Sequence, residues 1–365
     1  MVSFVNSNET SLAQCSEPVS TAELNRYLCP HCHSKKVKLE RSYSTKNNGD
    51  RQLYFCQDCE RYFSETYGSP IAGLNTSLSK ICQVLKARTS GIGLNRTAYV
   101  FGISKNTIIN WEKRLGQLKE PLFLYALLHN FLQLILEGDE LYTRVEKNKP
   151  PSESEGWTIV LMERATRFIW TLECGEKQRK LFLEAVVTLV EIFDQSEKLV
   201  LFTDGERSYS QLVFEICHEL FYSGKPGRPP QVLPKDLVIR LKNKSSQRRD
   251  SQGKVQKVET PKREHPETSI SIEEREVHAN HVEAFNSSLR RDLSAFRRRT
   301  NTYAKSQQSL QRVLDIFWLI HNFVKPHFTT KEVPAVGLGI LEKGLTIEEL
   351  LQLPIGANSL RVRLE

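Results

Sequence analysis

Two CxxC pairs near the start of the chain constrain its fold more than any other feature. Cys29 and Cys32 form the first pair, and after 23 intervening residues Cys56 and Cys59 form the second. Two thiolates from each pair are the ligand set of one tetrahedral Zn²⁺, and the residues between such pairs usually form short strands. We therefore predict a zinc ribbon over residues 25–72. A pair of disulfides is the less favoured alternative.

The segment 73–120 has the pattern of a helix-turn-helix. Gly102 suits the tight turn after a first short helix, and Ser104 suits the N-cap of a second helix. The second helix would expose four polar side chains that we predict to contact DNA, namely Lys105, Asn106, Asn110 and Arg114. A helical hairpin without a DNA partner has the same pattern. The zinc ribbon before it and the net charge of +8 favour DNA.

The order of elements over residues 121–330 predicts a mixed α/β sheet. Three apolar strands are followed by a helix, a further strand and another helix. Asp139 lies near the end of the first strand and Asp204 just after the fourth, and ligand sites gather at strand ends in such sheets. Residues 222–275, with 13 Lys or Arg against 7 Asp or Glu, are predicted to be a basic insertion that is either solvated or in contact with nucleic acid.

Two smaller elements are predicted outside this plan. Leu237–Leu241 and Val255–Val258, both within the insertion, are expected to pair as a hairpin. Residues 331–365 are expected to be a C-terminal tail with one short helix. Thr346 and Glu349 have the spacing of a capping box at the start of that helix.

Residues 278–306 are predicted to form a long basic helix that packs on the sheet. Its apolar side chains recur at helical spacing: Val282, Phe285, Leu289, Leu293 and Phe296. Glu283 lies beside this stripe, where its carboxylate would be half-buried among amide and guanidinium groups. The residues of this segment predicted to contact DNA are Asn286, Arg290, Arg297, Arg298, Arg299 and Lys305. Taken alone, the pattern is better explained by a core helix with a solvated charged face, and only the rest of the chain favours the functional interpretation.

Three carboxylates from separate elements could hold metal ions together. Asp139 and Asp204 belong to the sheet, and Glu283 belongs to the helix expected to pack on it. Three carboxylates can hold two divalent ions about 3.5–4 Å apart, which activate the nucleophile and the leaving oxygen of a phosphodiester. Such hard oxygen ligands favour Mg²⁺ or Mn²⁺. The rival acids near the same strand ends are Glu137, Glu140 and Glu206.

Composition narrows the class of protein further. The chain has 51 Lys and Arg against 43 Asp and Glu, which favours a polyanionic partner. Its N-terminus has no basic region followed by an apolar run, and residues 1–24 are predicted to be a flexible arm. The most apolar segment, Leu122–Leu136, is too short and too interrupted to span a membrane. We therefore expect a soluble intracellular protein without a membrane partner, whose other four cysteines are reduced.

The chain resembles the DDE transposases of bacterial insertion sequences, most closely the insertion-sequence-one family. The matching motifs are the two CxxC pairs, Gly-Ile-Ser-Lys-Asn-Thr-Ile-Ile-Asn-Trp ending at Trp111, Asp139-Glu140, Thr203-Asp204-Gly205, and His281-Val-Glu-Ala-Phe-Asn286 running through Arg290 to Lys305-Ser306. They cover roughly residues 25–330. The departures are the 78 residues between Asp204 and Glu283, more than the family usually has, and a single continuous reading frame.

This resemblance implies a multidomain α+β protein with a ribonuclease H-like catalytic domain over residues 121–330. It implies that Asp139, Asp204 and Glu283 bind Mg²⁺ or Mn²⁺, and that the substrate is double-stranded DNA. The expected protein is a transposase that binds the terminal inverted repeats of its element and catalyses strand cleavage and strand transfer. It would act as a homo-oligomer on DNA, in a prokaryotic cytoplasm close to the nucleoid. The alternatives are a DNA-binding regulator that has lost catalysis, and a stand-alone nuclease.

Overall fold

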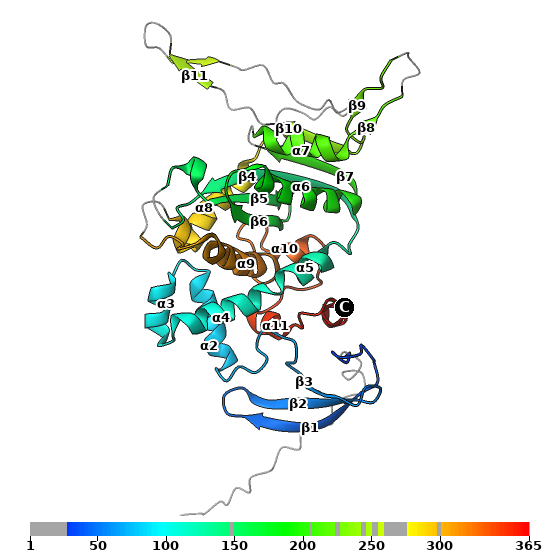
Figure 1. The fold of residues 1–365 in the computed structure, drawn as a ribbon, viewed down its shortest axis with the longest axis vertical. Helices are drawn as coiled ribbons and strands as arrows, with labels where there is room; N and C mark the ends of the chain where they lie inside the picture. Colours follow the sequence, from blue (N-terminus) through cyan, green and yellow to red (C-terminus); the bar gives the residue numbers. More distant parts are fainter. Residues whose placement is uncertain are drawn as a thin grey trace, which may run out of the picture.

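A computed structural model describes residues 28–146, 149–203, 206–222, 227–241, 246–249, 255–258, 276–297 and 301–364. The predicted arm at 1–24 lies outside these ranges. The molecule is elongated (Figure 1): a small sheet lies at one end, a group of helices follows, and a larger sheet lies beyond them. Among the helices so described, none is both long and apolar enough to cross a membrane.

The small sheet is an antiparallel ribbon of β1 (Val37–Thr45), β2 (Gly49–Cys56) and β3 (Tyr62–Ser64). Its own core is small: among the described residues, Tyr54, Phe63, Cys29 and Cys56 are buried, and Val37, Leu39 and Cys59 pack against them. Stacking of the two rings, 5.6 Å apart, adds little to so small a core. A segment of this size normally needs a metal or a disulfide to stay folded.

Four helices follow the ribbon: α2 (Leu78–Arg88), α3 (Leu94–Phe101), α4 (Lys105–Gly116) and α5 (Lys119–Ala126). Gly102 ends α3 in the left-handed conformation, with φ of +59°, which glycine adopts without steric cost. Ser104 caps α4 by accepting a hydrogen bond from the Thr107 amide at 3.1 Å. The turn between α3 and α4 therefore lies at Gly102 and Ser104, the two residues predicted from the sequence.

The larger sheet is mixed and has the strand order β10-β7-β4-β5-β6. Its strands are β4 (Phe131–Tyr142), β5 (Trp157–Glu163), β6 (Ile169–Gly175), β7 (Ser196–Thr203) and β10 (Leu237–Leu241). β4, β5 and β6 are antiparallel neighbours, whereas β7 and β10 run parallel to β4. The short 3-10 turn η1 (Pro151–Glu153) precedes β5, and α6 (Arg179–Asp194) and α7 (Arg207–Cys217) flank β7 in the chain. The predicted mixed α/β sheet is confirmed.

The hairpin predicted inside the insertion is wrong. Leu237–Leu241 is β10, which pairs with β7 at the edge of the large sheet. Val255–Val258 is β12, which pairs with β11 (Ser246–Arg249), and β8 (Glu219–Leu220) pairs with β9 (Gln231–Val232). The segment 222–275 therefore includes one strand of the core sheet. The apolar pattern of residues 237–241 predicts a strand, but it does not show whether the partner strand is near or distant in the chain.

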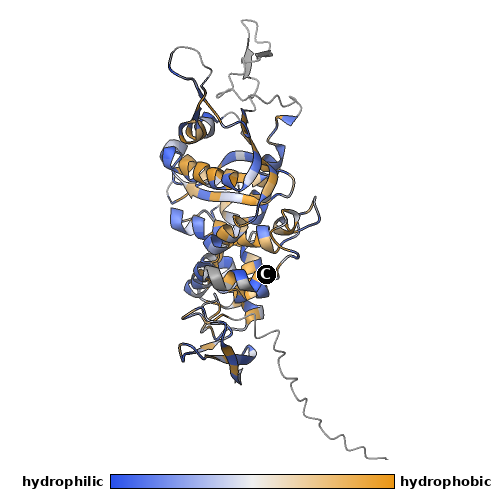
Figure 2. Cartoon of the chain, turned by 90° about the vertical axis from the view of Figure 1, so that its right-hand side faces the viewer, coloured by the Kyte–Doolittle hydropathy of each residue, from blue (hydrophilic) through white to orange (hydrophobic). Residues whose placement is uncertain are grey.

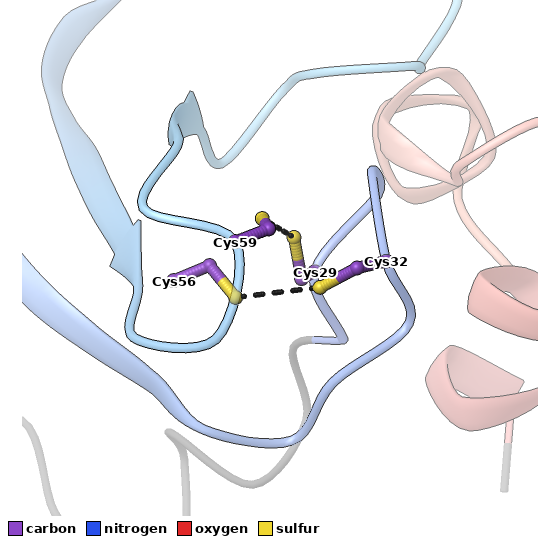
Figure 3. Close-up of side chains that lie close together, drawn as sticks. All are labelled: Cys29, Cys32, Cys56 and Cys59. Carbon is purple, nitrogen blue, oxygen red and sulfur yellow. Dashed lines mark hydrogen bonds between the residues drawn. The ribbon is translucent and has the colours of Figure 1, made fainter.

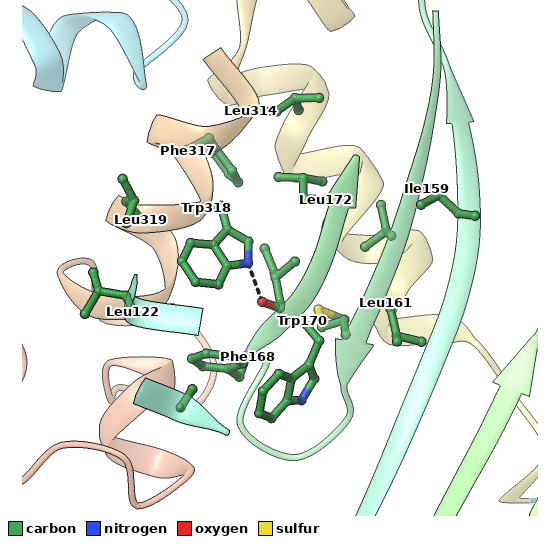
Figure 4. Packing of buried hydrophobic residues seen from close by; sticks show 14 of the residues in the cluster. Leu122, Ile159, Leu161, Phe168, Trp170, Leu172, Leu314, Phe317, Trp318 and Leu319 are labelled. Atoms are coloured by element: carbon green, nitrogen blue, oxygen red, sulfur yellow. Dashed lines mark hydrogen bonds between the residues drawn. The ribbon is translucent and has the colours of Figure 1, made fainter. Parts of the chain in front are cut away.

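The helix α9 (Gln307–Phe323) packs on β6 and buries the largest side chains of the core (Figure 4). Trp318 donates its indole N–H to the Ile169 carbonyl at 2.6 Å, so the ring is buried without losing a hydrogen bond. Phe168 lies between Trp170 and Trp318, with ring centroids 4.8 and 6.2 Å away. Hydrophobic residues gather in the middle of the molecule, on the sheet and the helices beside it (Figure 2).

One hydrophobic core joins helix α4 to the large sheet, because α9 lies between them (Figure 1). Glu112 of α4 is fully buried at this junction. Its carboxylate accepts hydrogen bonds from Arg88 of α2 at 2.6 Å and from Arg312 of α9 at 2.9 Å. Two guanidinium groups on one carboxylate satisfy its lone pairs, as a buried charge requires.

The C-terminal segment is more than a tail with one helix. It forms α10 (Pro334–Gly337), α11 (Ile347–Gln352) and α12 (Ala357–Leu364). Leu350, Leu351 and Leu360 join the main core, and the Ile355 amide donates to the Gly68 carbonyl at 2.9 Å. The predicted capping box is present at the start of α11. This segment therefore packs across the helices and reaches the end of the ribbon.

The predicted long helix is shorter than expected. α8 (Asn280–Asp292) ends at Leu293, whose φ and ψ of −117° and 120° are extended, and the 3-10 turn η3 (Ser294–Phe296) follows. Leu293 and Phe296 are still buried, at 1% and 4% exposure. The apolar spacing therefore identified core residues correctly, although the chain reaches the last two through a turn.

Candidate functional site

The four cysteines of the ribbon come together from two loops (Figure 3). The sulfur atoms of Cys29 and Cys59 are 3.5 Å apart, and so are those of Cys32 and Cys56. Four sulfurs at about 2.3 Å from one zinc ion lie about 3.8 Å from one another. The cluster therefore has the size and the ligands of a structural zinc site, as predicted.

The chemistry of Cys56 also suits a metal ligand. Burial raises the pKa of its thiol, but hydrogen bonds from the backbone of Cys59 and Asp58 outweigh burial and lower that pKa to about 7. A thiolate is the form that binds metal, so part of the cost of deprotonation is met by the fold of the knuckle itself.

The exposed side of α4 carries most of the predicted DNA-binding residues. Lys105, Asn106 and Asn110 are exposed, while Ile108 and Trp111 are buried beneath them. Arg114 differs from the expectation of full exposure. It is half-buried, and its guanidinium donates to the Ala72 carbonyl at 2.7 Å and to the Pro70 carbonyl at 3.3 Å. Arg114 thus ties α4 to the segment that leads into α2.

Asp139 of β4 is in direct contact with α8. Its Oδ2 accepts a hydrogen bond from the Asn286 side-chain amide at 2.8 Å, and its Oδ1 accepts one from the Glu140 backbone amide at 2.8 Å. Asn286 is 5% exposed, so little of its side chain is accessible for the predicted contact with DNA. On the buried side of α8, the Asn286 side-chain amide thus binds the Asp139 carboxylate of the sheet.

Glu137, two residues before Asp139 on the same face of β4, anchors the start of α8. It is fully buried and accepts hydrogen bonds from the backbone amides of His281 and Val282, each at 2.9 Å. Arg164 donates to its other oxygen at 2.8 Å. A carboxylate at the N-terminus of a helix satisfies orphan amides and the helix dipole. Glu137 is therefore structural, although it forms a possible metal cluster with His278 and His281.

Glu283 lies between these two anchors on α8. Val282 is held by Glu137, and Asn286, one turn after Glu283, is held by Asp139. The helix therefore presents Glu283 on the face of the sheet that carries Asp139. Its side chain is exposed and not half-buried as expected.

Asp204 lies outside the described residues. Thr203, directly before it, ends β7 and pairs with Gly138, the neighbour of Asp139. The pairing of β4 with β7 thus places the residue before Asp204 beside the residue before Asp139. A site shared by the two acids requires this arrangement.

The rival acids Glu140 and Glu206 are both paired. Lys177 donates to Glu140 at 2.5 Å and to Glu206 at 3.2 Å, and its ammonium lies 4.6 Å from the Trp157 ring centroid. The hydroxyl-bearing ring of Tyr209 is buried next to Gly138. Burial, together with the charges of Glu140, Asp139 and Glu206, raises the pKa of Tyr209 well above its usual value.

The basic residues of the predicted helix have different positions. Arg290 is half-buried on α8, whereas Arg297 lies beyond the end of α8 and so does not share a helical face with Glu283. The Arg297 guanidinium lies against Gly91, where φ is +85° and an added Cβ would be 2.8 Å from the Arg291 carbonyl oxygen. Arg298 and Arg299 lie outside the described residues. Lys305 is exposed on the ring of Tyr303, 3.7 Å from its centroid.

Sequence reasoning missed Arg164 and Lys177, the cations that neutralise Glu137 and Glu140. Each is a single basic residue just beyond a strand end, and neither belongs to a motif or a periodic stripe. The only available signal was their position after apolar strands, which is shared by many surface residues.

The comparisons with known proteins add no relative to this geometry. No protein-family model matches the chain, and no curated protein matches it either. The arguments for function therefore rest on the residues and on their arrangement.

Proposed function

We propose that this protein is a DDE-type transposase, which binds the ends of its insertion sequence and cuts and joins DNA. The observation that carries the proposal is the position of Glu283, one helical turn from the Asn286 that holds Asp139. Asp139 lies on the central strand β4, and Glu283 lies on the helix α8 that is bonded to that strand through Asn286. The strand order, with three antiparallel strands followed by two parallel ones, supports a ribonuclease H-like catalytic domain.

The donors at this site suit a hard divalent cation. Asp139 and Glu283, with Asp204, would hold Mg²⁺ or Mn²⁺ through oxygen atoms. Bound there, the metal would supply an activated water or 3′-hydroxyl and would stabilise the leaving oxygen. The protein's own contributions are orientation and charge: Asn286 fixes the Asp139 carboxylate, and Arg290 offers a planar cation to a phosphate.

The N-terminal parts would supply recognition. We propose that the ribbon holds one zinc ion and that Lys105, Asn106 and Asn110 of α4 read the terminal repeats in a major groove. Because α4 shares a core with the catalytic sheet, binding of DNA by α4 would place a neighbouring duplex at a fixed distance from Asp139. Action on two element ends would require a homo-oligomer on the DNA, in the nucleoid of a prokaryotic cell.

The test uses the full chain, Mg²⁺ or Mn²⁺, and labelled duplexes that carry the inverted repeats flanking the gene. We expect strand cleavage and joining by the parent chain, and their loss in Asp139→Asn and Glu283→Gln with DNA binding retained. Asp292→Asn, on the same helix but paired with Lys325 at 3.2 Å, is the matched control and should stay active. DNA binding without any cleavage by the parent would favour the regulator, and cleavage without joining would favour the nuclease.

A further inference from the structure

Arg144 and Lys305 lie on the ring of one tyrosine at the edge of the candidate catalytic site. The guanidinium carbon of Arg144 is 4.0 Å from the Tyr303 ring centroid, and the ammonium of Lys305 is 3.7 Å from it. A hydrogen bond from Lys305, together with the charges of Lys305 and Arg144, also lowers the pKa of Tyr303. Such contacts hold a cation in place through the negative face of the ring.

These two cations have no carboxylate partner within the part of the chain that the structure describes. Arg144 is half-buried, and its Nε atom is buried without a hydrogen-bond partner. A guanidinium N–H removed from water normally has an acceptor, because burial without one is costly. A pair of cations with a buried donor that lacks an acceptor is a site that an anion would complete.

The cluster is held rigidly next to β4. Val145, which is 3% exposed, forms a bridge with Ala304, and the Glu146 amide donates to the Ala304 carbonyl at 2.9 Å. Arg144 follows Asp139 by five residues, so their Cα atoms are at most about 18 Å apart. A DNA strand whose phosphodiester lies at Asp139 would therefore pass within reach of both cations.

We infer that Arg144 and Lys305 bind one backbone phosphate of the DNA strand being processed, and that Tyr303 is the positioning residue that orients both cations. This inference rests on the proposed function and adds Arg144 and Tyr303 to the residues that hold the DNA. The contact is to the backbone, so it fixes the register of the strand and reads no base.

The test is the salt dependence of binding to a fluorescent random-sequence duplex of about 30 base pairs, measured between about 50 and 200 mM salt. One lost phosphate contact lowers the magnitude of the slope of log K against log salt by about 0.9. We expect this full decrease for the double variant Arg144→Gln, Lys305→Gln, and a part of it for each single variant. Tyr303→Leu should lower the slope in the same direction, whereas Tyr303→Phe keeps the ring and should bind as the parent does.

The matched control is Lys331→Gln, because Lys331 also lies on an aromatic ring, 4.1 Å from the Phe328 centroid, but outside this cluster. Arg144→Lys keeps the charge and replaces Arg144→Gln if that variant does not fold. It should retain the parental slope, while Lys305→Gln should still have a lowered slope. Parental slopes in folded Arg144→Gln and Lys305→Gln would overturn the inference. Failure of the proposed function would instead appear as a parent chain that binds DNA without cleaving it, or as an Asp139→Asn variant that cleaves as the parent does, while the slope changes persist.

Discussion

Asn286 of α8 donates its side-chain amide to Asp139 of β4 at 2.8 Å, across 147 residues of chain. This bond orients a carboxylate that would otherwise rotate, and it uses a residue whose side chain is little accessible to DNA. The other anchor of α8, Glu137, binds the first turn of the same helix. Together they set where Glu283 lies relative to the sheet.

The bond between Asn286 and Asp139 predicts a catalytic effect without an effect on DNA affinity. Asn286→Ala removes the donor that orients a metal-binding carboxylate, and loss of such a partner typically costs about 10–100-fold in activity or metal affinity. We expect cleavage to fall by that factor in rate assays, with the same salt slope as the parent. A lowered salt slope with an unchanged cleavage rate would mean that Asn286 contacts DNA after all.

Glu137→Gln should destabilise the fold strongly. The substitution leaves Arg164 near a buried site without its charge partner and weakens the anchor of α8. Removing one partner of a buried ion pair costs about 3–5 kcal/mol. Urea unfolding of the full chain measures this loss. The control is Glu342→Gln at an exposed position, where a change within about 0.5 kcal/mol is expected. A similarly small loss for Glu137→Gln would show that the anchor is dispensable.

One zinc ion per chain is expected from the four cysteines. Cys56→Ser should lower the zinc content measured by elemental analysis, while Cys217→Ser, outside the cluster, should keep it. Because metal binding requires thiolates, zinc affinity should fall as the pH drops and the four thiols regain their protons. A full equivalent of zinc in Cys56→Ser would exclude the site.

Arg114 and the two asparagines of α4 should behave differently. Asn106→Ala and Asn110→Ala should relax the preference for terminal-repeat DNA over random DNA by about 1–3 kcal/mol per base contact. Arg114→Ala should instead lower the free energy of unfolding, because its guanidinium bonds the backbone at Ala72 and Pro70. Competition binding and urea unfolding of the same variants separate the two effects. A stable Arg114→Ala with weakened binding to all DNA would restore a phosphate contact for Arg114.

His321 predicts a loss of stability in acid. Burial is the main cause that lowers its pKa to about 4, and its Nε2 lies 2.9 Å from the Arg167 carbonyl. Between pH 6.5 and 4 the unfolded chain therefore binds a proton that the folded chain does not, so stability falls as the pH drops through this window. His321→Gln should flatten the curve of unfolding free energy against pH. An unchanged curve in His321→Gln would assign the acid sensitivity to other groups.

Several features followed from the sequence alone because they are local. The four cysteines lie in two short loops, so their spacing determines their convergence. Ser104 and Thr346 cap helices through amides only three residues away. The apolar stripe of residues 282–296 identified buried positions correctly, and the order of strands and helices predicted a mixed sheet.

The tertiary structure decided which distant element each residue meets. Periodicity shows that one face is buried but not what lies against it, so β10 was assigned to a hairpin and Asn286 to DNA. In the sequence, Arg114 and Glu137 cannot be distinguished from ordinary charged surface residues. Only the packing shows that Arg114 donates to a backbone carbonyl and that Glu137 accepts from the first turn of α8. The physical reason is range: caps and chelate spacings act within a few residues, whereas partners across 100 or more residues are selected by the free energy of the whole packed core.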